Sequence, residues 1–225
     1  MMQNDDKFTV KTGTIEELTK NETLPLEEQK KVDELDKILK VKPNDIPTLM
    51  EKAFILFENQ IDGKAIEVFK QVIDIDYIYV DAYVWLAELF LFHWADIERA
   101  EPYLVEALQI DQNRANVHKL YADLYAEKQD QFKQLYHLQK SIELEPSWLS
   151  PRISLIELLL SQKKYKLAKK QLEEAYYQIQ SPFPIPHNPM QQYYELLITG
   201  RTGYTKKDLD EYKKRIEENL AKKPY

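Results

Sequence analysis

The chain has 225 residues, a hydrophobic fraction of 44%, 15 tyrosines and a formal net charge of −7 at pH 7. This apolar content excludes a disordered chain, and the lack of cysteine excludes disulfides and thiolate metal sites. The acidic balance argues against nucleic acid or an anionic membrane as the main partner, because both need a basic surface.

The N-terminal third begins with residues that show no periodicity and ends in a clear helix pattern. Residues 1–13 are polar, so we expect a flexible tail. They lack the basic and apolar regions of a secretory signal, and no part of the chain has about 20 consecutive apolar residues, so we expect a cytoplasmic protein. Thr14 and Glu17 form the T-x-x-E pattern of a capping box. Val32 and Leu35 then begin an apolar stripe that predicts an amphipathic helix over 26–41.

From residue 46 onward, apolar residues recur at a fixed period, which is typical of a repeat array. Equivalent units start at Ile46, Val80, Ala115 and Leu149, and the spacings are 34, 35 and 34 residues. We place the extra residue of the second unit in the turn 93–99. Alanines occupy the positions where two antiparallel helices must approach closely. These contact positions are Ala53, Ala65, Ala87, Ala100, Ala107, Ala122, Ala168 and Ala175.

These units resemble the tetratricopeptide repeat, in which small residues stand at positions 8, 20 and 27 and large apolar ones at 4, 7, 11 and 24. The resemblance covers residues 12 to 180 and implies an all-α fold, a right-handed α-solenoid of antiparallel helix pairs in one domain. Lys52, Gln134 and Pro102 depart from the pattern, which affects local geometry only. The predicted divisions are a tail at 1–13, a repeat array at 14–180 (half unit 14–45, units 46–79, 80–114, 115–148 and 149–182), a Pro-rich loop at 181–189, and a degenerate repeat with a capping helix at 190–225.

The C-terminal region breaks this period at the segment SPFPIPHNP, whose prolines favour an extended loop. Asn188 and Pro189 then predict the start of a helix that ends at Gly200. Thr205 is positioned to cap a last helix over 206–221. The apolar face of that helix consists of Leu209, Tyr212, Ile216 and Leu220.

Motifs for catalysis are absent from the sequence. The four histidines include no pair at i, i+4, and neither H-E-x-x-H nor G-x-S-x-G occurs. The string GRTG at 200–203 is too short for a phosphate loop and predicts a helix end with a turn. We therefore predict no enzymatic activity, no cofactor and no metal site.

The resemblance also implies where a partner binds, because in this family the first helices of successive repeats line a concave groove. The residues that it assigns to partner binding are Met50, Glu51, Phe54, Phe57, Glu58, Val84, Trp85, Glu88, Phe92, Lys119 and Asp123. The groove is aromatic and acidic, so the implied partner is another protein that presents a basic, partly apolar helix or extended segment. The implied role is an adaptor or chaperone-like protein, with the neutralisation or escort of a toxin or effector as one subtype.

One branch of the family binds free C-terminal carboxylates through a clamp of Lys, Asn and Arg. The corresponding positions here are Met50, Phe54, Val84 and Glu88, with Lys119 as the single match, so we predict no binding of acidic chaperone tails. Two alternatives stay open. The chain itself could cover the aromatic residues, or the protein could be a structural subunit of a stable complex or a self-associating homodimer that uses its edges and the 181–189 loop.

Overall fold

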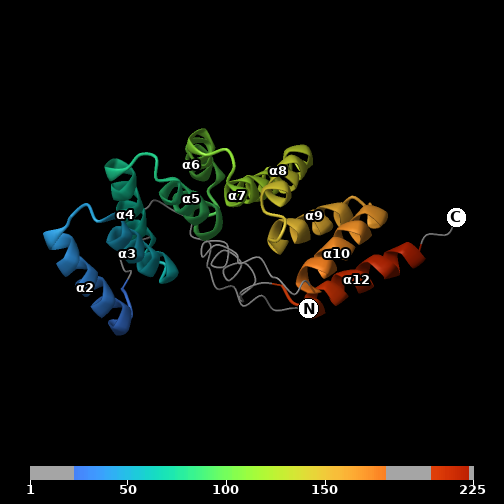
Figure 1. Cartoon of the computed structure of the whole chain (residues 1–225), viewed down its shortest axis with the longest axis horizontal. Coiled ribbons are helices and arrows are strands. Elements are labelled where there is room, and N and C mark those ends of the chain that lie inside the picture. Colours follow the sequence, from blue (N-terminus) through green and yellow to red (C-terminus); the bar gives the residue numbers. More distant parts are fainter. Residues whose placement is uncertain (1–22, 181–203, 223–225) are drawn as a thin grey trace. The chain divides into compact units, whose positions relative to one another are not determined.

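The computed structural model describes residues 23–180 and 204–222, and these parts consist of helices and short connections without a strand (Figure 1). The capping box at Thr14, the loop at 181–189 and the helix after Asn188 lie outside the described residues. The helices are α2 (Leu26–Val41), α3 (Ile46–Glu58), α4 (Asp62–Ile75), α5 (Val80–Glu88), α6 (Ile97–Ile110), α7 (Ala115–Glu127), α8 (Gln131–Leu144), α9 (Leu149–Ser161), α10 (Tyr165–Gln180) and α12 (Lys206–Ala221). The predicted all-α solenoid class is confirmed. None of the described helices combines the length and apolar character needed to cross a membrane.

The first helices of the four units begin at Ile46, Val80, Ala115 and Leu149, the residues at which the sequence period restarts. Acidic side chains start several helices by accepting a hydrogen bond from a backbone N–H of the first turn. Asp45 accepts from the N–H of Thr48 at 3.2 Å. Asp96 and Asp130 do the same for α6 and α8, at 2.8 Å and 3.1 Å.

The chain divides into two compact units, residues 1–112 (unit 1) and 113–225 (unit 2). In unit 1, α2 packs on α3, α3 on α4, α4 on α5 and α5 on α6 (Figure 1). Ala53, Ala65 and Ala100 are fully buried, which lets paired helices approach closely. The unusual Lys52 of α3 donates to the carboxylate of Asp36 on α2 at 2.6 Å.

Unit 1 accommodates the extra residue of its 35-residue repeat inside a helix. A π-helix, η1 (Leu89–His93), directly follows α5, and a π-helical turn holds one residue more than an α-helical turn. We predicted that the extra residue would lie in the turn 93–99. It lies earlier because Leu89, Phe90 and Leu91 are all buried and keep the chain helical up to His93. Ala95, with φ 48°, then ends the helical segment.

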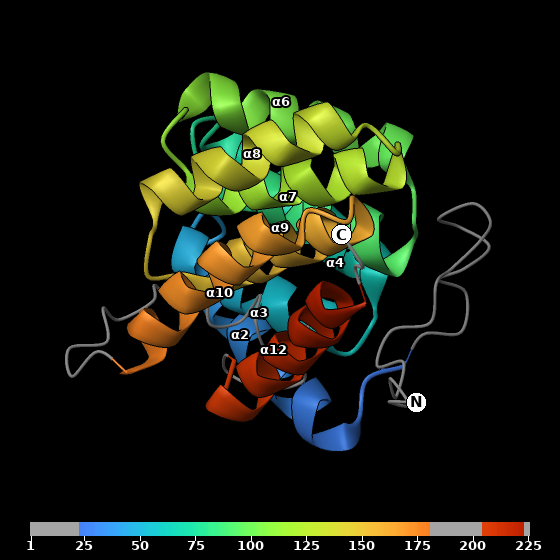
Figure 2. The same cartoon turned by 90° about the vertical axis from the view of Figure 1, so that its right-hand side faces the viewer.

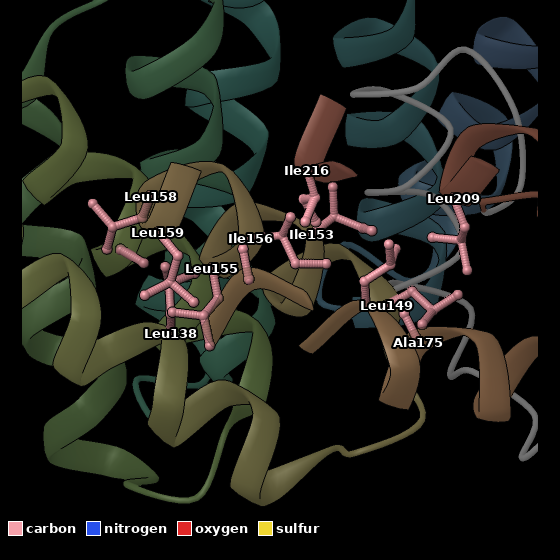
Figure 3. Packing of buried hydrophobic residues seen from close by; sticks show 13 residues of the cluster. Leu138, Leu149, Ile153, Leu155, Ile156, Leu158, Leu159, Ala175, Leu209 and Ile216 are labelled. Atoms are coloured by element: carbon pink, nitrogen blue, oxygen red, sulfur yellow. The ribbon is translucent and has the colours of Figure 1, made fainter. Parts of the chain in front are cut away.

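Unit 2 packs α7 on α8, α8 on α9, α9 on α10 and α10 on α12 (Figure 2). Its core has α9 at the centre: Leu155 and Leu159 lie beside Leu138 of α8, whereas Ile153 lies beside Ile216 of α12 (Figure 3). The core therefore continues through α9 from the preceding helix pair to the last helix.

The start and the packing of α12 agree with the prediction that Thr205 caps this helix. The carboxylate of Asp208 accepts from the backbone N–H and the hydroxyl of Thr205, both at 2.6 Å. The hydroxyl of Tyr212 donates to Glu157 of α9 at 2.7 Å. The apolar stripe of α12 faces the core of unit 2, since Leu209 and Ile216 are buried in it.

Candidate binding surface

Among the predicted aromatic residues, Trp85 contacts both Phe54 and Phe57, and the three form what we call the aromatic layer of unit 1. The ring centroid of Trp85 lies 4.6 Å from that of Phe54 and 5.3 Å from that of Phe57, in edge-to-face geometry. Phe54 also lies 6.2 Å from Phe69 of α4. Phe57 and Trp85 are buried, so the layer belongs to the packing of α3, α4 and α5.

The other predicted partner-binding residues differ in their access to solvent. Met50, Val84 and Glu88 are buried. Phe92 is half-buried. In unit 2, Lys119 of α7 is buried, and its ammonium group lies 2.5 Å from the half-buried carboxylate of Asp123 one helical turn later.

The two exposed residues of the predicted set, Glu51 and Glu58, form an acidic stripe on α3 together with Phe54. These residues stand at i, i+3 and i+7, so they share one face of the helix. Both glutamates are exposed and the ring between them is half-buried. Phe54 packs against the buried Trp85 ring of the aromatic layer. The stripe therefore offers two carboxylates on either side of one fixed aromatic ring.

A buried polar network below the stripe was not foreseen in the sequence. The carboxylate of Asp62, at the start of α4, accepts from Nδ1–H of His93 and from Nε1–H of Trp94, both at 2.8 Å. All three residues are buried, and the His93 ring stacks on Phe57 with centroids 4.5 Å apart. The network joins the end of η1 to α4. Through the stack of His93 on Phe57 it also contacts the aromatic layer. The sequence indicated this network only indirectly, because the extra residue of the 35-residue repeat falls near His93 and Trp94.

Unit 2 contains a second cluster, in which two histidines face each other between α7 and α8. The Nδ1 atoms of His118 and His137 lie 3.0 Å apart, and Tyr121 stacks on His137 at 4.7 Å. Burial, together with the nearby His118 and Lys133, lowers the pKa of His137 to about 4. His118 is buried, as expected for a packing position. Within residues 23–180 and 204–222, no group of three or more His, Cys, Asp and Glu side chains could hold a metal ion.

Solved structures of similar fold are tetratricopeptide repeat proteins and the protein MamA. TTC0263, a thermophilic TPR protein in Thermus thermophilus, is 21% identical and gives a TM-score of 0.57 over 86% of this chain and 91% of that chain. MamA from Desulfovibrio magneticus RS-1 is 16% identical, with a TM-score of 0.57 over 75% and 97% of the two chains. YrrB, described as a TPR protein with an unusual peptide-binding site, is 12% identical, with a TM-score of 0.55 over 84% and 93%. Neither a family model nor a curated protein matches the sequence. The chain therefore has the tetratricopeptide repeat fold.

Proposed function

We propose that this chain is a non-catalytic protein-interaction module, an adaptor or chaperone-like protein, that binds a basic, partly apolar segment of another protein. The acidic stripe of Glu51, Phe54 and Glu58 carries this proposal. A partner in helical form would place an apolar side chain on the Phe54 ring, and Lys or Arg side chains near its ends would reach the two carboxylates. Each unit has a further candidate contact of its own, the half-buried Phe92 in unit 1 and the half-buried Asp123 in unit 2.

The buried residues of the predicted set support this surface from within. Met50, Phe57, Val84 and Trp85 are buried, and Trp85 packs edge-to-face on Phe54, so it limits the positions that the Phe54 ring can adopt. A ring whose rotamer is already fixed loses little conformational entropy when a partner binds it. The peptide-binding site named for YrrB shows that this fold can hold a peptide, which is an analogy at the level of fold. Neutralisation or escort of a toxin or effector is a subtype of the same role.

The test is a peptide library presented to the full chain, with basic and apolar residues at i, i+3 and i+4. We expect basic–apolar peptides to bind with higher affinity than acidic ones, as measured by fluorescence anisotropy. Glu51→Lys with Glu58→Lys should weaken the best peptide by roughly tenfold or more, since like charges then face each other. Phe54→Ala should also weaken it, through loss of the apolar contact.

A matched control is available on α2, where Glu27 and Glu34 are exposed at the same i, i+7 spacing. Glu27→Lys with Glu34→Lys changes the net charge equally and should leave peptide affinity within about twofold, because exposed rim charges contribute little. The proposal fails if both double variants weaken binding equally, or if acidic peptides are selected.

A further inference from the structure

Two exposed apolar surfaces in the chain carry opposite charges. Unit 1 contains 24 acidic and 12 basic residues, whereas unit 2 contains 14 acidic and 19 basic ones. The net charges of −12 and +5 add up to the −7 of the whole chain. Segregation of this size within one chain favours association with a surface of opposite sign.

The first surface, which we call the basic face, lies on α8 and α10 of unit 2. Between Glu157 and Glu173 the sequence has five lysines and no acidic residue. All five are exposed, and none forms an ion pair with the described parts of the chain. Two large apolar side chains accompany them, Leu167 at 54% exposure and Phe132 at 90%.

A hydrogen bond joins α8 to the turn that precedes α10. The side-chain amide of Gln162, in the turn before α10, donates to the side-chain carbonyl of Gln131 in the first turn of α8 at 3.0 Å. Phe132 therefore lies close to the turn that holds Lys163 and Lys164. The basic face therefore combines exposed apolar side chains with lysines that have no acidic partner in the described parts of the chain, which suits contact with an acidic surface.

The second surface, which we call the acidic face, lies at the α4–α5 connection of unit 1. Between Lys70 and Arg114 the sequence has nine acidic residues and a single basic one, Arg99. Tyr77 and Ile78 are 76% and 56% exposed in this connection. The hydroxyl of Tyr83 donates to the carbonyl of Tyr77 at 2.9 Å, which anchors the connection to α5.

Glu106 of α6 belongs to the same acidic face. Burial is the main cause that raises the pKa of Tyr83, and the carboxylates of Glu106 and Asp76 raise it as well. Both carboxylates therefore lie close to the Tyr83 hydroxyl. The face therefore combines Asp76, Glu106 and the exposed side chains Tyr77 and Ile78. Like the basic face, it combines exposed apolar side chains with charged ones, but the sign of the charge is opposite.

We propose that the acidic face of one copy binds the basic face of a second copy. The two faces are different surfaces, so the contact is head-to-tail, and a bound pair still has one acidic face and one basic face free for further copies. Association then continues to short oligomers as concentration rises. The apolar side chains supply the buried area, and the charges select the orientation.

Sedimentation velocity on the full chain tests this proposal over a concentration series. We expect larger species at about 0.05 M salt and their loss at about 0.5 M, where the Debye length falls to a few ångströms. Lys166→Glu with Lys170→Glu should give monomers, and so should Asp76→Lys with Glu106→Lys. Circular dichroism on each variant checks that the helices remain, since all four positions lie at or near the surface.

The decisive measurement mixes the two reversed variants in equal amounts. Each keeps one native face that matches a native face of the other, so larger species should return in the mixture. The control Lys64→Glu with Lys70→Glu reverses two exposed lysines of α4 outside both faces and should still associate. A monomeric native chain overturns the proposal, and so does a mixture that stays monomeric. Binding of the basic face to anionic vesicles or to RNA by a chain that remains monomeric also overturns it.

Discussion

Replacing Asp62 by Ala removes the shared acceptor of the buried network. Nδ1–H of His93 and Nε1–H of Trp94 each lose a hydrogen bond of 2.8 Å inside unit 1. A buried donor that loses its acceptor costs about 1–3 kcal/mol, so two donors set a range of about 2–6 kcal/mol. Removal of the buried carboxylate offsets part of this loss, because its desolvation no longer opposes folding. We expect the free energy of unfolding to fall by about 3 kcal/mol.

The assay combines urea unfolding of the full chain with hydrogen exchange followed by mass spectrometry. Exchange should accelerate in α3, α4 and η1 of unit 1 and stay unchanged in α9, α10 and α12 of unit 2, since local opening reports local stability. Asp45→Ala is the matched control: it removes the carboxylate that caps α3 in the same unit, and should cost about 1 kcal/mol. The reasoning is refuted if Asp62→Ala destabilises the protein no more than Asp45→Ala does.

Three further predictions concern packing, pH and the last helix. Phe57→Ala should lower the free energy of unfolding by about 3–5 kcal/mol in urea titrations, because the ring is fully buried. Since the pKa of His137 is lowered in the folded protein, to about 4, the unfolded chain takes up the proton first. Stability should therefore fall as pH drops from about 6.5 towards about 4, by roughly 1–2 kcal/mol, and thermal unfolding of His137→Gln should show less of this dependence. Asp208→Ala should speed hydrogen exchange in residues 206–221 by about fivefold, corresponding to about 1 kcal/mol, whereas Glu211→Ala should not.

Most of the scaffold was predictable because its determinants are local and repeat at a fixed period. Small residues such as Ala53 and Ala100 mark helix crossings, and an acid or threonine before a helix, such as Asp96 or Thr205, marks its first residue. The same local logic predicted α2 and α12 with the bounds that the structure has.

The position of the extra residue and the burial of the groove side chains depend on tertiary packing and were harder to predict. A period of 35 residues shows that one residue is added, but a turn and a π-helix satisfy that count equally. Position in a repeat assigned Phe57, Trp85 and Glu88 to the concave side, yet large rings on α3 and α5 fill the space between the helices. The network of Asp62 with Trp94 joins residues 32 positions apart, which no helical period reveals.

The π-helix limits how far the repeats of this protein can be exchanged for one another. Each added residue in a helix turns the following side chains by about 100°. Within Leu89–His93 the wider turn absorbs that rotation, so Trp85 keeps its contact with α3 while Trp94 still reaches Asp62. A chimaera that replaces residues 80–114 with a 34-residue unit would keep the helix pair but remove His93 and Trp94, and with them the two donors to Asp62. In any exchange of repeats, residues 62–94 should therefore be kept or replaced together as one segment.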